Sequence, residues 1–201
     1  MTRRLVLATR NAHKVAELRA ILAGTGLDVD LVGADAYPGI PDVKETGVTF
    51  AENALLKART LAEGTGLPAV ADDSGLCVDV LGGAPGIFSA RWAGRHGDDT
   101  ANLDLLLAQL SDIDTGHRAA HFACAAALAL PDGTTRVAEG RLTGTLRHTP
   151  AGSGGFGYDP ILQPDGETRT CAELSADEKN AISHRGKAFR ALAPLVAELL
   201  G

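Results

Sequence analysis

Two adjacent aspartates interrupt an apolar stretch of this chain, VADDSGLCVDVL at residues 70–81. Asp72 and Asp73 would repel each other if both were ionised and poorly solvated. One interpretation is a polar turn, because Asp, Ser and Gly are ordinary turn residues. The other is a cation site, since Mg²⁺ takes oxygen ligands and Glu45 of KETG (44–47) offers a third carboxylate. These residues alone leave both interpretations open.

A second set of polar residues lies in TRNAHK (9–14), between an expected strand and an expected helix. Thr9 and Asn11 offer side-chain hydrogen bonds, Lys14 offers a point charge, and the helix N-terminus offers free N–H groups. This combination suits a phosphate group, although Asn11 could instead only cap the helix. The chain contains no GxxxxGK[ST] motif, so a Walker A loop is excluded.

The glycine-rich segment GSGGFG (152–157) matches GxGxxG by its letters, but RHTPA precedes it and YDP follows it. A dinucleotide fingerprint needs a strand before the glycines and a helix after them, and the proline disfavours a helix that starts at Tyr158. The segment instead suits a turn in which Phe156 or Tyr158 offers a ring to stack on a base and Asp159 offers a carboxylate. Packed aromatic residues at a turn are the alternative.

A basic segment, EKNAISHRGKA (178–188), is expected to form one short helical stretch that ends at Gly186. The helix dipole alone would favour cations near a helix C-terminus. A His-Arg pair beside a glycine can also donate hydrogen bonds to a base carbonyl or a phosphate. The cations of the segment are Lys179, His184, Arg185 and Lys187.

Hydrophobic spacing and turn residues predict a mixed α/β fold. The expected strands are 3–8, 29–32, 69–71, 76–81, 118–130, 134–139 and 142–146, with a hairpin turned at PDGT. The expected helices are 11–23, 49–64, 100–110, one opened by Ser175, and a last helix that Pro194 bends. Capping boxes pair Thr49 with Glu52 and Ser175 with Glu178. In the helix 49–64, Asn53 and Lys57 are spaced i, i+4 and share one face.

Composition restricts the classes of function. The chain has 201 residues, 45% of them hydrophobic, which is enough for one domain with a real core. A net charge of −6 argues against electrostatic binding to a long nucleic acid. No apolar stretch reaches membrane-spanning length. Three scattered cysteines suit a reducing compartment. We therefore expect a cytoplasmic protein that binds neither nucleic acid nor membrane.

In five stretches the chain resembles the Ham1-like noncanonical purine nucleoside triphosphate pyrophosphatases, also called inosine/xanthosine triphosphate pyrophosphatases. The stretches are LATRNAHKVAEL, ETGVTFAENALLKA, ADDSGLCVDVLGGAPGIFSARWAG, GGFGYDPI and EKNAISHRGKA, between residues 5 and 188. The resemblance implies a single domain over 1–201, with an elongated mixed β-sheet flanked by helices and two lobes around a central substrate cleft. It also implies a homodimer and Mg²⁺-dependent hydrolysis of ITP, dITP and XTP to the monophosphate and pyrophosphate.

The resemblance also assigns roles to single residues. Asp73 would activate the attacking water and bind the metal, with Asp72 and Glu45 helping to hold the cation and Lys57 near the phosphates. Arg10 stands where many members have glycine, which adds a charge beside the triphosphate. The remaining substrate contacts are expected at Thr9, Asn11, Lys14, Ser74, Phe156, Gly157, Tyr158, Asp159, Lys179, His184 and Arg185, the last three of which would recognise the 6-keto purine.

Physical chemistry supports such a reaction. A free Asp has a pKa of about 4, so Asp73 would be ionised at neutral pH and ready to accept a proton. Donors from His184 and Arg185 would pair with a 6-carbonyl but would face the amino donor of adenine, and an unmatched buried contact costs about 1–3 kcal/mol.

Two other functions stay open. One is a nucleotide sensor that no longer hydrolyses, which the complete acidic set disfavours. The other is a related pyrophosphatase for modified pyrimidines, which the EKNAISHR stretch disfavours.

Overall fold

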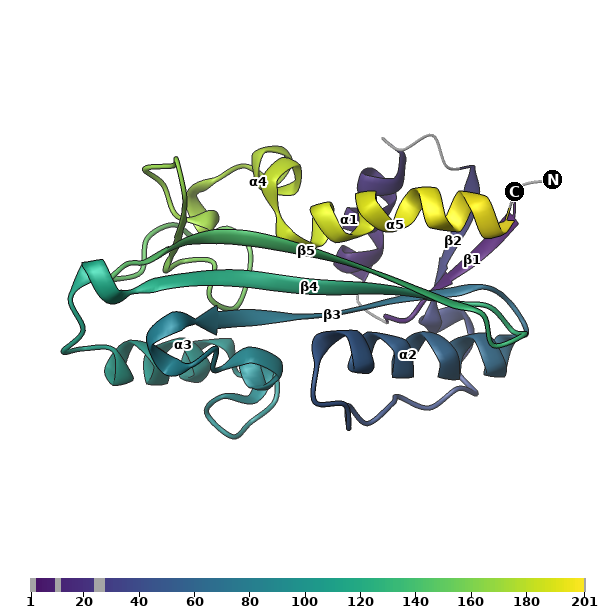
Figure 1. Ribbon diagram of the computed structural model, residues 1–201, viewed down its shortest axis with the longest axis horizontal. Helices are drawn as coiled ribbons and strands as arrows, with labels where there is room; N and C mark the ends of the chain where they lie inside the picture. The colour runs from purple at the N-terminus through teal and green to yellow at the C-terminus, as the bar shows by residue number, and fades with distance from the viewer. Residues whose placement is uncertain (1–2, 10–11, 24–27, 201) are drawn as a thin grey trace. The chain divides into compact units, whose positions relative to one another are not determined.

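A six-stranded sheet is the framework of the computed structural model, which describes residues 3–9, 12–23 and 28–200 (Figure 1). The strand order is β2-β1-β3-β4-β5-β6. β1 is parallel to β2 and β3, whereas β5 and β6 are antiparallel, so the predicted α/β fold with a mixed sheet is confirmed. The strands are β1 Arg3–Leu7, β2 Val29–Gly33, β3 Ala69–Val78, β4 Ala119–Ala129, β5 Thr135–Leu146 and β6 Leu162–Pro164.

Helices follow the predicted starts closely where a capping residue marks them. The Ser175 and Glu178 side chains form both halves of a capping box. Thr49 caps its helix by accepting from the Glu52 N–H, but the Glu52 carboxylate accepts from Val48 rather than from Thr49, so only half of that box forms. The helices are α1 Ala12–Ala23, α2 Phe50–Thr65, α3 Asp99–Gln109, α4 Ala176–Ile182 and α5 His184–Leu200, with 3₁₀ turns at Ala34–Ala36, Asp79–Leu81, Gly86–Arg91, Thr115–His117 and Cys171–Glu173.

The aspartate doublet lies inside one continuous strand, so the prediction of a polar turn there is wrong. β3 passes through Asp72 and Asp73 without a break. Asp, Ser and Gly have only a weak intrinsic preference against the strand conformation, and pairing with neighbouring strands outweighs it.

Two other boundaries also differ from prediction. β5 is one strand where two were predicted; Gly140 interrupts the pattern because an added Cβ would collide with the backbone of His184, not because the strand ends. The basic segment forms two helices, α4 and α5, because Ser183 is extended between them, with φ −61° and ψ 150°.

The chain divides into two compact units, each with its own core. Unit 1 comprises residues 1–73, 124–140 and 184–201, and unit 2 comprises 74–123 and 141–183. The strands β3, β4 and β5 each contribute residues to both units. Along β3, the division falls directly after Asp73.

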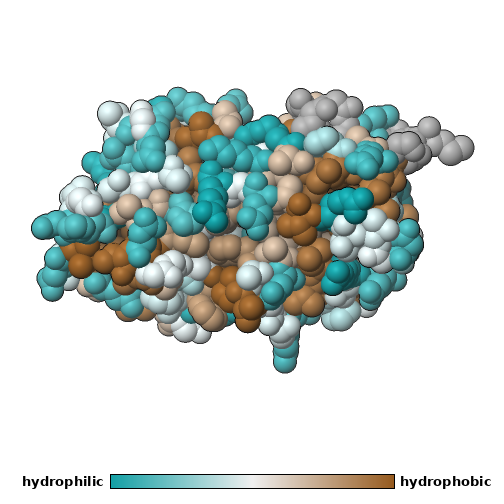
Figure 2. All heavy atoms as spheres, viewed as in Figure 1, coloured by the Kyte–Doolittle hydropathy of each residue, from teal (hydrophilic) through white to brown (hydrophobic). Residues whose placement is uncertain are grey.

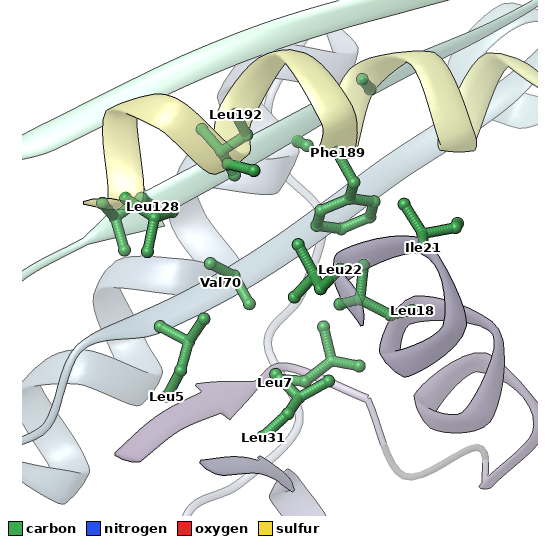
Figure 3. Close-up of a cluster of buried hydrophobic side chains, with 14 of the residues drawn as sticks. Leu5, Leu7, Leu18, Ile21, Leu22, Leu31, Val70, Leu128, Phe189 and Leu192 are labelled. Carbon is green, nitrogen blue, oxygen red and sulfur yellow. The ribbon is translucent and has the colours of Figure 1, made fainter. Parts of the chain in front are cut away.

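In unit 1, the sheet is covered on both faces, by α2 on one and by α1 and α5 on the other (Figure 1). Side chains alternate along β3 and β4, so even-numbered residues such as Val70 and Leu128 pack with α1 and α5. Figure 3 shows the Phe189 ring of α5 among Leu18, Leu22 and Val70. The odd-numbered residues facing α2 are all alanines: Ala69, Ala71, Ala125, Ala127 and Ala129.

Unit 2 has a separate apolar core around α3 and a buried cation beside it. Leu106 and Leu110 of α3 pack with Leu76, Leu146 and others. Arg118 is only 1% exposed, and its guanidinium donates to the backbone carbonyl oxygens of Leu110, Ile113, Leu146 and Arg147. These hydrogen bonds satisfy a charge that burial would otherwise make costly.

Hydrophilic and hydrophobic side chains are interspersed on the face drawn in Figure 2. The described large apolar side chains that are most exposed are Val48, Phe156 and Phe88. None of the described helices combines the length and hydrophobicity that crossing a bilayer requires.

Candidate active site

The two aspartates of β3 serve opposite faces of the sheet. Adjacent side chains of a strand point to opposite sides, so Asp73 follows Ala69 and Ala71 toward α2, while Asp72 follows Val70 toward α5. Their hydrogen bonds agree: Asp73 accepts from Lys57 of α2, and Asp72 accepts from Arg185 of α5. The repulsion expected between neighbouring carboxylates is thus relieved by separation and by two different cations.

On the α2 face, one lysine joins two carboxylates. Lys57 Nζ lies 2.8 Å from Glu45 Oε1 and 3.3 Å from Asp73 Oδ1. The side chains of Lys57, Glu45 and Asp73 are 19%, 24% and 12% exposed. Asn53 Nδ2 donates to the other carboxylate oxygen of Asp73 at 3.1 Å. We call Glu45, Asn53, Lys57 and Asp73 the acidic cluster.

Burial and charge set the protonation equilibria of this cluster. Burial raises the pKa of the Asp73 carboxyl; Lys57 opposes that rise, and repulsion from Glu45 adds to it, so the pKa lies above its usual value. Burial lowers the pKa of Lys57, but attraction to Asp73 and Glu45 outweighs burial and raises it overall. Lys57 therefore keeps its proton, and Asp73 is a stronger base than a free aspartate.

Glu45 comes from a segment without regular structure, and α2 holds this segment in place. The Gly47 N–H donates to Asn53 Oδ1 at 2.8 Å, and the Val48 N–H donates to Glu52 Oε2 at 2.7 Å. The N-terminal end of α2 thus fixes the backbone on which Glu45 lies.

On the opposite face of β3, Asp72 and Arg185 form a buried ion pair. Arg185 Nε lies 3.1 Å from Asp72 Oδ2, and the side chains are 5% and 9% exposed. Arg185 occupies the first turn of α5, because that helix begins at His184. The sequence predicts Arg185 as a purine contact and Asp72 as a cation ligand; in the structure these two residues bind each other.

The carboxylate oxygens of the acidic cluster are suitable ligands for a hard divalent cation. Glu45 and Asp73 supply carboxylate oxygens, which Mg²⁺ prefers, and it often needs only one or two protein carboxylates beside water and phosphate oxygens. Among the residues that the structure describes, no three Asp, Glu, His or Cys side chains gather as a ready ligand set. The three carboxylates that the sequence predicts around one cation are thus not grouped in that way.

A second polar group lies in unit 2, around a buried aspartate. Asp159 is 3% exposed, and its Oδ2 accepts from Lys179 Nζ at 2.6 Å and from the Phe156 N–H at 2.8 Å. Lys179 Nζ also lies 5.3 Å from the centre of the Phe156 ring, a cation–π distance. The Phe156 side chain is largely exposed, and the Gly157 N–H donates to Asp99 Oδ2 at 3.0 Å. This loop therefore presents a ring from a fixed backbone.

Tyr158 belongs to the core of unit 2 rather than to the loop surface. It is 4% exposed, and its hydroxyl donates to the Ser89 carbonyl oxygen at 2.9 Å. Burial raises the pKa of this hydroxyl well above its usual value. Of the two rings proposed to stack on a base, only Phe156 is exposed.

The remaining predicted residues are placed as follows. Thr9 lies two residues after the end of β1 and is half-buried, and Ser74 is half-buried in β3. His184 is 8% exposed at the start of α5. Arg10 and Asn11 lie outside the described residues, as does the side chain of Lys14.

Two residues that form hydrogen bonds in the candidate site were not predicted as site residues. Asn53 was noted only for its position on the Lys57 face; a polar residue at an i, i+4 spacing from a candidate lysine was the available signal. Asp99 has no sequence signal, since its contact to Gly157 joins residues 58 positions apart.

A profile of the Ham1 family matches residues 5–195, nearly the whole chain. The chain belongs to the Ham1 family. Within the Ham1 family, a dITP/XTP pyrophosphatase of Streptomyces coelicolor is 84% identical over 198 residues, which cover 98% of this chain and 99% of that protein. The dITP/XTP pyrophosphatase of Streptomyces avermitilis is 83% identical with the same coverage.

Solved structures agree with this family assignment. A HAM1 protein from Coxiella burnetii superposes with a TM-score of 0.89 at 41% identity, covering 98% of this chain and all of that chain. A nucleoside-triphosphatase (dITP/XTP pyrophosphatase) from Mycobacterium abscessus gives a TM-score of 0.78 at 53% identity, covering 96% and 98%. The fold described above is thus the Ham1 fold.

Proposed function

We propose that this Ham1-family protein hydrolyses noncanonical purine nucleoside triphosphates, with dITP, ITP and XTP as substrates, to the nucleoside monophosphate and pyrophosphate. The observation that carries the proposal is the acidic cluster, in which Asp73 is buried between a lysine and an amide. The names of the 83–84% identical relatives supply the substrate class.

Asp73 acts as the general base of the reaction. In its ionised form this carboxylate can accept a proton from the attacking water. Lys57 and Asn53 occupy one position on each oxygen, but a carboxylate has about four acceptor sites, so sites remain for the water. Lys57 holds Asp73 and Glu45 at a fixed separation and offers a positive charge to the phosphates.

Glu45 and Asp73 hold the Mg²⁺ ion. When bound, this ion neutralises charge on the phosphate oxygens and on the departing pyrophosphate. Asp72 and Arg185 stabilise the strand and helix that carry the site through their buried ion pair. The phosphates are contacted by Thr9, Arg10, Asn11, Lys14 and Ser74, as the resemblance to the family implies.

Base recognition falls to the loop around Phe156 in unit 2. The exposed Phe156 ring stacks on the purine, and Asp159 fixes the loop backbone and orients Lys179. The resemblance to the family supports Lys179 and His184, each in its own unit, as residues that recognise the 6-keto purine. Gly157 and Tyr158 shape the loop, with Tyr158 anchored to Ser89.

The protein acts as a homodimer in the cytoplasm. Family resemblance supports the dimer. Three free cysteines, Cys77, Cys124 and Cys171, support a reducing compartment.

Product analysis tests the reaction directly. Purified protein with Mg²⁺ should release pyrophosphate from dITP and XTP, and removal of Mg²⁺ by EDTA should stop the release. dATP should be hydrolysed at least about tenfold more slowly, because each mismatched buried contact costs about 1–3 kcal/mol. Orthophosphate as the first product, or equal rates with dATP, would contradict the proposal.

Replacing the proposed base tests its role. Asp73→Asn should lower kcat by about 10²–10⁴-fold, the usual contribution of general base catalysis, while nucleotide binding persists. Asp104→Asn, on the exposed surface of α3, is the matched control and should keep full activity. An Asp73→Asn protein with unchanged kcat would remove Asp73 from the mechanism.

A further inference from the structure

Asn53 is a fully buried polar side chain in the first turn of α2, and both the oxygen and the nitrogen of its amide form hydrogen bonds. Its exposure is 0%. The amide oxygen accepts from the backbone N–H of Gly47 at 2.8 Å, and the amide nitrogen donates to Asp73 Oδ2 at 3.1 Å. One side chain therefore joins the segment that carries Glu45 to the strand that carries Asp73.

We propose that Asn53 is a positioning residue that holds the carboxylate of Asp73 in a fixed orientation relative to the Glu45 segment. This inference rests on the proposed pyrophosphatase reaction. Asn53 acts only through Asp73 and Gly47, without touching the substrate.

The amide orientation follows from the partners. A backbone N–H can only donate, so the oxygen of Asn53 must face Gly47. The NH₂ group then faces Asp73, where it donates to a carboxylate that can only accept while ionised. An aspartate at position 53 would still accept from Gly47, but it would direct a second negative charge at Asp73. The site thus requires an amide.

Asn53 and Lys57 form two parallel bridges from one face of α2. The long side chain of Lys57 binds the carboxylates of Glu45 and Asp73. The short side chain of Asn53 binds the Asp73 carboxylate and the backbone of Gly47, in the same segment as Glu45. A lysine ammonium is a rotatable point charge and does not set the rotation of a carboxylate plane. The second contact, at the other oxygen of Asp73, restricts that rotation.

Gly47 is part of the same arrangement. A Cβ added at Gly47 would lie 2.7 Å from Asn53 Oδ1 and 2.7 Å from Glu52 Cβ. Only glycine lets the Glu45 segment come close enough for its N–H to reach Asn53. The close approach serves the hydrogen bond, since the backbone of Gly47 is not in a left-handed conformation.

Loss of the amide should affect the chemical step rather than substrate affinity. A base displaced by about 1 Å can cost on the order of 100-fold in rate. We expect Asn53→Ala and Asn53→Asp to lower kcat for dITP by about 10–100-fold while KM changes less than about threefold. Gly47→Ala should lower kcat in the same way, because it displaces the Asn53 oxygen.

Asn102 provides the matched control. It is 1% exposed in α3, and its Oδ1 accepts from the Ala93 backbone N–H at 2.7 Å, so it equals Asn53 in residue type, burial and backbone bond. The two residues differ at the amide nitrogen, since Asn53 Nδ2 donates to Asp73 and the buried Asn102 Nδ2 has no hydrogen-bond partner among the described residues. Asn102→Ala should therefore lower the thermal midpoint by no more than Asn53→Ala does, and should leave kcat within about twofold of wild type.

The experiment measures pyrophosphate release and thermal unfolding for the wild type and all four variants. Wild-type protein that releases no pyrophosphate would refute the proposed function itself. Active wild type with unchanged kcat in the folded Asn53 and Gly47 variants would overturn the positioning role, and so would an equal loss of kcat in Asn102→Ala. If Asn53→Ala does not fold, the near-isosteric Asn53→Asp and the Gly47→Ala variant decide the question.

Discussion

Removing one member of the Asp72–Arg185 pair should destabilise the fold strongly, because the remaining charge would be left buried. The two side chains are only 9% and 5% exposed, with a 3.1 Å separation between Oδ2 and Nε. Breaking a buried ion pair by deleting one partner typically costs about 3–5 kcal/mol. Domains of this kind have about 5–15 kcal/mol in total, so Asp72→Ala and Arg185→Met should each remove a large part of the stability.

The double variant separates a structural pair from two independent residues. If the cost of each single variant comes from its orphaned partner, Asp72→Ala/Arg185→Met should cost no more than about 3–5 kcal/mol, well below the sum of about 6–10 kcal/mol. The expected coupling is therefore at least about 3 kcal/mol.

Urea unfolding of the four proteins, followed by circular dichroism, gives the free energies of unfolding. Slopes with urea should agree among the variants, so that midpoints report stability alone. Single costs that add within about 0.5 kcal/mol, or single variants that each cost less than about 1 kcal/mol, would show that the pair does not stabilise the fold. Either result would favour the roles that the sequence predicts, Asp72 as a cation ligand and Arg185 as a purine contact.

Two further substitutions test electrostatic features of unit 2. Arg118→Met should lower the free energy of unfolding by about 2–6 kcal/mol, because the carbonyl oxygens of Leu146 and Arg147 each lose a donor at about 1–3 kcal/mol, whereas that of Leu110 keeps the Ile113 N–H. Urea midpoints measure this, and a cost below about 1 kcal/mol would contradict it. The hydrogen bond from Arg169 and the Ser175 N–H lower the pKa of Glu178 to about 2. A carboxyl whose pKa is lowered by folding stabilises the fold at any pH above its usual pKa of 4.5. This stabilisation is lost as the pH falls from 4.5 toward 2. The stability deficit of Glu178→Gln should therefore shrink between pH 7 and pH 3.5, and a constant deficit would refute the assignment.

Features set by local chemistry were predictable from the sequence. Ser175 and Glu178 stand three residues apart before a helix, and both capping hydrogen bonds form because they need only neighbouring backbone. The spacing of Asn53 and Lys57 placed both on one face of α2 for the same reason. Residue types also predict oxygen ligands for a divalent cation and a phosphate-binding helix start, and both stay predictions.

The tertiary structure decided the partners. The Asp-Asp-Ser-Gly stretch has turn composition, yet its backbone forms a strand because pairing with other strands, distant in sequence, outweighs a weak local preference. Because side chains of a strand alternate between its two faces, Asp73 binds Lys57 and Asn53 on one face. Asp72 binds Arg185, 113 residues away in the sequence, on the other face. No local pattern encodes that separation, since it depends on which helix covers each face of the sheet. The sequence by itself determined which groups were available for chemistry, and the packing of α2 and α5 on opposite faces determined which cation each of the two aspartates binds.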